Sequence, residues 1–345
     1  MEARFGTLAR VRAYLQAKRS VLSLRAAPTQ AEQIDMLAQL QQPSDDYFVA
    51  SLKVVEHAEM RAVPVRPVAQ PNALKHFLDG IQRQRILYYE GIVPVFYAYL
   101  SAVVRSRVDR KMCCVKQNDA LRQQDALYAP LGYVDSTGLK QYGIALRDLE
   151  VGEPLPPHPT LIQLAASRIS SDREELERKL AETWLRWLSK ERQEDWLVVD
   201  GAIRTSSEIA PHARVIGIAK TSIGVERELS PEQMKVVYGL RKAERSSVFE
   251  LKHRKHAPVY SWFLRLHDPT KGSLLYGLLR VEMPANESLL KQVDALSAWI
   301  LEDRVPLAVP DTRYDRLLYP MRDCEHYLRA HAPSVAQLEA LAQLV

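Results

Sequence analysis

The segment Trp196–Ile203 constrains the fold of this chain more than any other stretch. Four apolar residues run directly into Asp200 and Gly201, a pattern typical of a strand that is buried on both faces and ends in a sharp turn. A second stretch, His76-Phe77-Leu78-Asp79-Gly80, has the same pattern. Two such strands would place two carboxylates at one edge of a sheet, which is a site for divalent metal ions. Each Asp-Gly pair, taken alone, is also a common turn.

Composition narrows the class of protein. No apolar run reaches the roughly 18 residues that a membrane-spanning helix needs, and the N-terminal segment has no signal-peptide core. Cys113 and Cys114 are adjacent and Cys324 is remote, so no disulfide or zinc framework is visible. We therefore expect a cytoplasmic protein without membrane contact. A net charge of +5 permits a nucleic-acid partner but does not require one.

Proline spacing indicates two parts. Three prolines between residues 61 and 72 predict a linker, which divides the chain into an N-terminal helical segment with linker at 1–72 and a core domain at 73–345. Helices are expected over 1–24 and 30–41 from their apolar spacing. The apolar stripe of this segment packs either on the core or on another protein.

Within the core domain, the apolar stretches predict a mixed α/β fold. Strands at 74–80, 84–90 and 93–104 would form an antiparallel meander, followed by a helix at 171–190. Glu177 lies at the border of the apolar face of that helix, whereas Glu182 points away. Glu177 is therefore either a site acid or an ordinary border acid paired on its own helix. Another apolar strand is expected at 213–221.

Carboxylates thus fall on the first strand, the helix and the fourth strand, as in ribonuclease-H-like nucleases. Asp79, Glu177 and Asp200 offer the hard oxygen ligands that Mg²⁺ and Mn²⁺ prefer. Two such ions would activate water and stabilise the leaving oxygen in phosphodiester cleavage. Lys220, near the end of the next strand, would offset charge on the phosphate.

A basic run follows the third predicted strand. It is either a solvated strand end or an edge that contacts DNA phosphates. Its members are Arg105, Arg107, Arg110 and Lys111.

Five motifs, in this order, resemble the NurA nucleases of DNA end resection. They are Leu78-Asp79-Gly80, Arg173 with Glu177 and Ala181, Leu197-Val198-Val199-Asp200-Gly201, Gly217-Ile218-Ala219-Lys220-Thr221, and Tyr319-Pro320 followed by His326. The chain departs from the family at Ile81, where serine is usual, and at Glu325, where a small residue is expected. The interval between Glu177 and Asp200 is long, which leaves Glu182 as the alternative third acid.

This resemblance implies a ribonuclease-H-like mixed sheet flanked by helices, with an N-terminal helical extension, acting as a homodimer. It implies cleavage of DNA ends and single strands with Mn²⁺ or Mg²⁺ by Asp79, Glu177, Asp200, Lys220 and His326. The partner that the resemblance implies is a hexameric HerA-type ATPase. This chain has no visible phosphate-binding Gly-Lys-Ser/Thr loop, so an ATP-driven role would need such a partner. The alternative is a nuclease-like subunit without catalysis that binds DNA and regulates the ATPase. Strand polarity, preference for DNA over RNA, and a role in repair or phage defence stay open.

Overall fold

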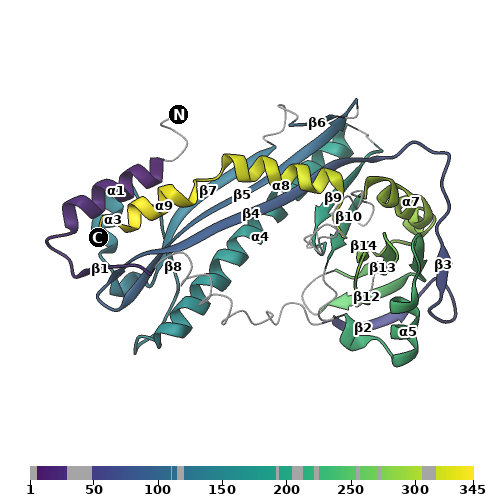
Figure 1. Cartoon of the computed structure of the whole chain (residues 1–345), viewed down its shortest axis with the longest axis horizontal. Coiled ribbons are helices and arrows are strands. Elements are labelled where there is room, and N and C mark those ends of the chain that lie inside the picture. The colour runs from purple at the N-terminus through teal and green to yellow at the C-terminus, as the bar shows by residue number, and fades with distance from the viewer. Residues whose placement is uncertain are drawn as a thin grey trace.

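A computed structural model describes residues 6–28, 49–109, 111–114, 120–191, 194–203, 213–220, 225–253, 257–269, 273–304 and 316–345. Within these ranges, fourteen strands join one mixed sheet, and helices flank both of its faces (Figure 1). The chain therefore has an α/β fold. None of the helices in the described ranges is long and apolar enough to cross a membrane.

The order of strands along the sheet is β2-β12-β13-β14-β10-β9-β4-β5-β7-β8, with β1, β3, β6 and β11 paired beside this path. The strands are β1 (Leu24–Ala26), β2 (Val49–Val54), β3 (Ala62–Pro64), β4 (Leu74–Glu90), β5 (Val93–Val108), β6 (Lys111–Cys113), β7 (Leu121–Ala129), β8 (Leu146–Asp148), β9 (Trp196–Asp200), β10 (Val215–Ala219), β11 (Glu244–Ser246), β12 (Phe249–His253), β13 (Val259–Arg265) and β14 (Leu278–Pro284). The α-helices are α1 (Gly6–Lys18), α3 (Ser136–Gln141), α4 (His158–Lys190), α5 (Pro231–Gly239), α6 (Glu287–Leu290), α7 (Val293–Asp303), α8 (Tyr319–His331) and α9 (Val335–Ala342).

A long antiparallel hairpin of β4 and β5 forms the middle of the sheet. The expected break between strands at 74–80 and 84–90 is wrong, because β4 runs through it without interruption. The intervening residues alternate between the two faces, and both faces are covered by helices. Gln82 faces α4, where it accepts a hydrogen bond from Arg173, and Arg83 faces the opposite side, where it donates to the carbonyl of Pro333. Gly91, at φ +60°, makes the turn into β5.

The parallel part of the sheet consists of β4, β9 and β10. Leu78 pairs with Val199, and Val199 pairs with Gly217. The strand expected before Asp200 and the strand expected over 213–221 are thus present as β9 and β10. Their carboxyl ends lie side by side next to the middle of β4.

Helices on the two faces close separate apolar clusters. On one face, Trp184 of α4 packs with Leu78 and Leu197. On the other face, Cys324 and Leu328 of α8 pack in a cluster that includes Phe77, Val198 and Ile218. In Figure 1, α8 and α9 cross one side of the hairpin and α4 lies on the other. Asp79, in the middle of β4, is therefore buried between helices, whereas Asp200, at the end of β9, keeps partial exposure.

The N-terminal segment belongs to the same packed structure. The stripe of α1, with Leu8, Val11 and Leu15, is buried with α9 residues in one cluster, so the stripe packs on its own chain. Residues 49–54 and 62–64, which fall in the expected helical segment and linker, are instead strands β2 and β3, paired with β12 and β11. The helix expected over 30–41 lies outside the described residues.

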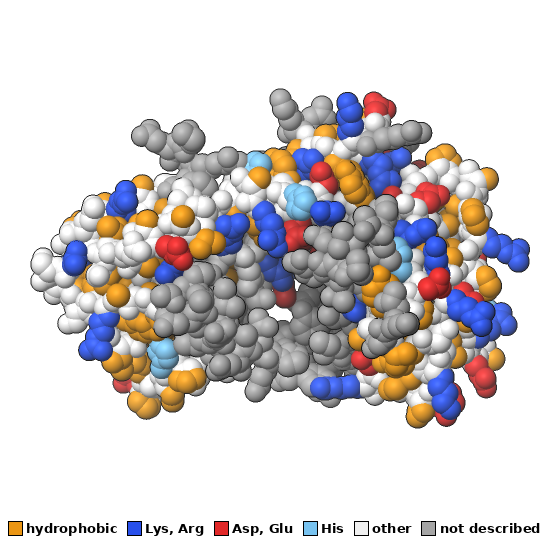
Figure 2. All heavy atoms as spheres, viewed as in Figure 1, with side chains coloured by type: hydrophobic (Ala, Val, Ile, Leu, Met, Phe, Trp, Pro, Cys, Tyr) orange, Lys and Arg blue, Asp and Glu red, His pale blue; other side chains and the backbone are white. Residues whose placement is uncertain are grey.

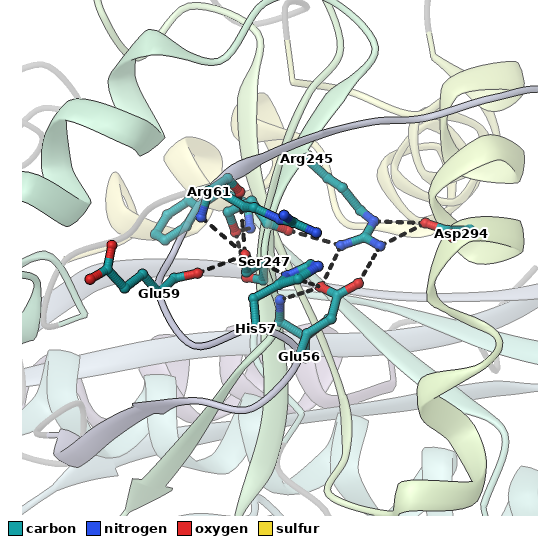
Figure 3. Close-up of polar contacts among 10 residues, drawn as sticks. Glu56, His57, Glu59, Arg61, Arg245, Ser247 and Asp294 are labelled. Atoms are coloured by element: carbon teal, nitrogen blue, oxygen red, sulfur yellow. Dashed lines mark hydrogen bonds and ion pairs between the residues drawn. The ribbon is translucent and has the colours of Figure 1, made fainter.

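A polar cluster fastens this segment to the second half of the sheet (Figure 3). The buried Arg245 guanidinium binds both carboxylate oxygens of Glu56, at 2.8 and 2.7 Å, and one oxygen of Asp294 on α7. Ser247 Oγ lies 2.9 Å from His57 Nδ1, and Glu56 approaches the same nitrogen at 3.7 Å. A catalytic triad needs the acid on the other ring nitrogen and an accessible hydroxyl, whereas Ser247 is fully buried. The cluster is a structural clamp.

Candidate functional site

The strand register brings Asp79 and Asp200 together. Each follows a paired residue, Leu78 on β4 and Val199 on β9, so the two acids stand next to each other on neighbouring parallel strands. Side chains alternate along a strand, and Phe77 and Val198 both face the α8 side. Asp79 and Asp200 therefore leave the sheet on that side. Burial raises the pKa of Asp79 well above its usual value, and the charges of Asp200 and Glu177 raise it further.

The turn after Asp200 is fixed by contacts with β10 and β14. Gly201 adopts φ +95°, a conformation that favours glycine. The carbonyl oxygen of Gly201 lies close to Gly217, and a Cβ atom on Gly217 would be only 2.5 Å from that oxygen. The backbone N–H of Ile203 then donates to the buried carboxylate of Glu282 at 2.9 Å. These contacts hold the Asp200 carboxylate at the end of its strand.

Glu177 reaches the same place from α4, on the other face of the sheet. Its carboxylate lies against the bare backbone of Gly80, where a Cβ would overlap it. Arg173, one helical turn earlier, donates to Glu177 and holds it there. Burial raises the pKa of Glu177 to about 7 although Arg173 opposes the shift, and the charge of Asp200 contributes to the rise. Glu177 thus lies next to Gly80 on the α4 side of β4, whereas the side chains of Asp79 and Asp200 lie on the α8 side, and the charges of the three acids act on one another.

Lys220 supplies the positive charge at this edge. It follows the last residue of β10, and its Nζ lies 2.8 Å from Asp200 Oδ2. Burial lowers the pKa of Lys220, but the carboxylates of Asp200, Asp79 and Glu325 outweigh burial, and the net shift is upward. Arg316 donates to the carbonyl of Lys220 at 2.7 Å, which fixes the backbone there. Lys220 therefore balances part of the negative charge of the acids.

Glu182, the alternative third acid, is placed differently. It is buried, although its helical position predicted that it would point away from the apolar face. Its carboxylate pairs with Arg178 and Arg186 of its own helix, while the neighbouring Trp184 and Leu185 are buried in the core. Burial here follows from the wide contact of α4 with the sheet, which a single apolar stripe does not reveal. The structure brings Glu177, and not Glu182, to Asp79.

The structure does not place the other predicted site residues next to the three acids. His326 is exposed on α8. Arg105 donates to Asp323 at 2.7 Å, and Arg107 donates to Asp303 at 2.7 Å. Both arginine side chains are largely covered, 12% and 19% exposed, so acids of the chain already occupy the groups expected to contact phosphate. Arg110 lies outside the described residues.

The donor set fits a hard divalent cation. Asp79 and Asp200 lie side by side on β4 and β9, and Glu177 lies against Gly80 on the α4 side of β4. Burial is the main cause of the raised pKa values of Asp79 and Glu177, and the charges of neighbouring carboxylates raise them further. Carboxylate oxygens are the ligands that hard divalent cations prefer. Across the described residues, no three acids, histidines or cysteines form a ready-made metal-binding group. Lys220 and Arg173 hold the oxygens of Asp200 and Glu177 in this arrangement. A cation would take the place of these internal partners.

No model of a protein family matches the chain, and no curated protein matches it. The functional proposal therefore depends on the geometry of the acids and on the sequence motifs.

Proposed function

We propose that this chain is a metal-dependent DNA nuclease. The observation that carries the proposal is the placement of Asp79 and Asp200 side by side on β4 and β9, with the Lys220 ammonium bonded to Asp200. Glu177 of α4 lies against Gly80, the neighbour of Asp79, and its charge acts on Asp79. The parallel arrangement of β4, β9 and β10 supports a ribonuclease-H-like core. The motif resemblance to NurA nucleases supports DNA as the substrate and Mn²⁺ or Mg²⁺ as the cofactor.

The three carboxylates would hold the cofactor, most simply as two ions. The bound ions would lower the pKa of a water molecule and stabilise the leaving oxygen of the phosphodiester. Asp79 and Asp200, on adjacent strands, set the position of the site. Glu177, with its pKa of about 7, exchanges its proton near neutral pH. Lys220 keeps a positive charge at the same edge, where it favours the approach of a phosphodiester anion.

The resemblance also supports two partners, a second copy of the chain and a hexameric HerA-type ATPase that feeds DNA to the site. The alternative function is a nuclease-like subunit that binds DNA and regulates the ATPase without cutting. The altered first motif, with Ile81 after Gly80, favours this alternative.

A cleavage assay separates the two functions. The full-length chain is incubated with end-labelled linear duplexes and with single strands, in Mn²⁺, Mg²⁺ or EDTA, with and without a co-purified hexameric ATPase. We expect cleavage that requires Mn²⁺ or Mg²⁺ and that the ATPase stimulates on duplex ends. Binding of DNA without cleavage under any of these conditions would support the regulatory subunit.

Replacing Glu177 by glutamine should lower cleavage by about a hundredfold or more, because one ligand charge is lost at nearly constant volume. The matched control is Glu182→Gln on the same helix, whose carboxylate pairs with Arg178 and Arg186. Initial rates at saturating Mn²⁺ compare the two variants. The opposite ranking would show that Glu182 is the third acid.

Replacing Gly80 by alanine should weaken Mn²⁺ binding by about tenfold, because the new methyl group displaces the Glu177 carboxylate. The clash falls on the Oε1, Cδ and Cγ atoms of Glu177, so the side chain must move away from its place beside Gly80. Isothermal titration with Mn²⁺ measures the effect, and Gly132→Ala, at a glycine with open space around it, is the control. Equal Mn²⁺ affinity in both variants would contradict the placement of Glu177.

A further inference from the structure

The helix α8 lies alongside β4 in a fixed register. Cys324 Sγ, which is fully buried, donates to the carbonyl of Phe77 at 3.3 Å, and further along Arg83 donates to the carbonyl of Pro333 at 2.6 Å. The helix therefore passes over the part of β4 that contains Asp79. Figure 2 shows basic and acidic side chains mixed in the middle of this face, where α8 crosses the hairpin.

One flank of α8 faces β5. Arg105 of β5 pairs with Asp323 at 2.7 Å, and its guanidinium lies 4.6 Å from the centre of the Tyr327 ring. At about 100° per residue, Asp323 and Tyr327 lie on one side of Cys324, and Glu325 lies about 100° to the other side. The opposite side of β4 holds β9 and β10.

Glu325 therefore lies on the flank that faces the ends of β9 and β10. His326, a further 100° or so around the helix, turns to the outside, and its exposure agrees with this position. Two observations place the same flank beside Lys220. Arg316, just before α8, donates to the Lys220 carbonyl, and the charge of Glu325 acts on the Lys220 ammonium.

We propose that Glu325 is a positioning residue that receives Lys220 when a divalent cation occupies the site, an inference that rests on the proposed function. Asp200, Asp79 and Glu325 all act on Lys220. The first two belong to the proposed ligand set, so a cation removes them as partners of the ammonium. Glu325 stands outside that set. It is held by Arg329 at 2.6 Å on the partly exposed side of α8, from which it can turn toward Lys220.

The exchange predicts a specific coupling between Glu325 and Lys220. In Glu325→Gln, the Lys220 ammonium has no second acid to move to. It therefore continues to compete with the cation for Asp200. Mn²⁺ affinity should then fall by about tenfold. In Lys220→Met the competitor is absent, so Mn²⁺ should bind at least as tightly as in the unaltered chain. Adding Glu325→Gln to Lys220→Met should change the affinity by less than about twofold, because the two residues act as a unit.

The test is a double-mutant cycle of Mn²⁺ affinity on the full-length chain, measured by titration calorimetry and by the electron paramagnetic resonance of free Mn²⁺. Glu339→Gln on α9 is the control, and melting temperatures without metal confirm that each variant folds. A tenfold loss that disappears in the Lys220→Met background supports the exchange. An equal loss in both backgrounds would mean that Glu325 contacts the ion directly, and no loss in either would remove it from the site. If the unaltered chain binds no Mn²⁺, the proposed function itself fails.

Discussion

Replacing Asp200 by asparagine should lower metal-dependent cleavage by roughly a thousandfold, since a ligand to a catalytic ion contributes several kcal/mol to transition-state stabilisation. The change keeps the volume of the side chain and the Gly201 turn that follows it. It removes the partner of Lys220, whose ammonium still has Asp79 and Glu325 nearby. Folding should therefore survive while catalysis is lost.

The control for Asp200 is Asp195, which lies just before the opposite end of the same strand, near His76. Asp195→Asn should retain nearly full activity. Rates are measured with excess enzyme on a labelled single strand, and melting temperatures are compared in the absence of metal. Full activity in Asp200→Asn would exclude Asp200 from the site, whatever the result for Glu177.

Mn²⁺ should bind at least about ten times more tightly at pH 8 than at pH 6, because the ion displaces protons from acids whose pKa values are raised. Glu177 has a pKa of about 7, so it holds a proton over part of this range, and burial also raises the pKa of Asp79. Below pH 7 the ion must first expel the Glu177 proton. Calorimetry in two buffers of different ionisation enthalpy measures the number of protons released, which should fall in Glu177→Gln.

The same shifts predict how stability depends on pH without metal. The folded state keeps a proton on Glu177 that the unfolded chain releases above its ordinary pKa of 4.5. Stability should therefore decrease as the pH rises from about 4.5 through 7, by at most about 1.4 kcal/mol per pH unit for this group. Mn²⁺ should oppose this trend and raise the melting temperature more at pH 8 than at pH 6. A metal-free stability that increases over this range, with no change in Glu177→Gln, would contradict the raised pKa.

Local sequence pattern was enough to place the parallel strands and two of the acids. Trp196 to Val199 is a short apolar run before Asp200 and Gly201, and a strand buried on both faces is the element that such a run favours. The border position of Glu177 on its helix left it either as a site acid or as an acid paired on its own helix, and the structure shows it both paired with Arg173 and placed against Gly80. The glycine beside Asp79 was interpreted as a turn, whereas its role is to leave space for Glu177 in mid-strand.

Local pattern could not reveal contacts between residues that are remote in sequence. Arg105 and Arg107 formed a basic run, but their partners Asp323 and Asp303 lie about two hundred residues away, beyond the reach of any local pattern. Helix α8 was not predicted, because most of its residues are polar and few are buried. Its orientation, and with it the placement of Glu325 rather than His326 toward the site, depends on the tertiary register of Cys324 over Phe77.

The cluster shared by α1 and α9 affects how the protein forms during synthesis. Leu8 and Val11 are synthesised long before Leu338 and Leu341, yet these residues pack in one core against the outer half of β4 and β5. Contacts of such separation are slow to form, and this core is incomplete until α9 leaves the ribosome. The backbone amides in the outer half of the hairpin should thus be the last to become protected from hydrogen exchange. The same strand, β4, also carries Asp79.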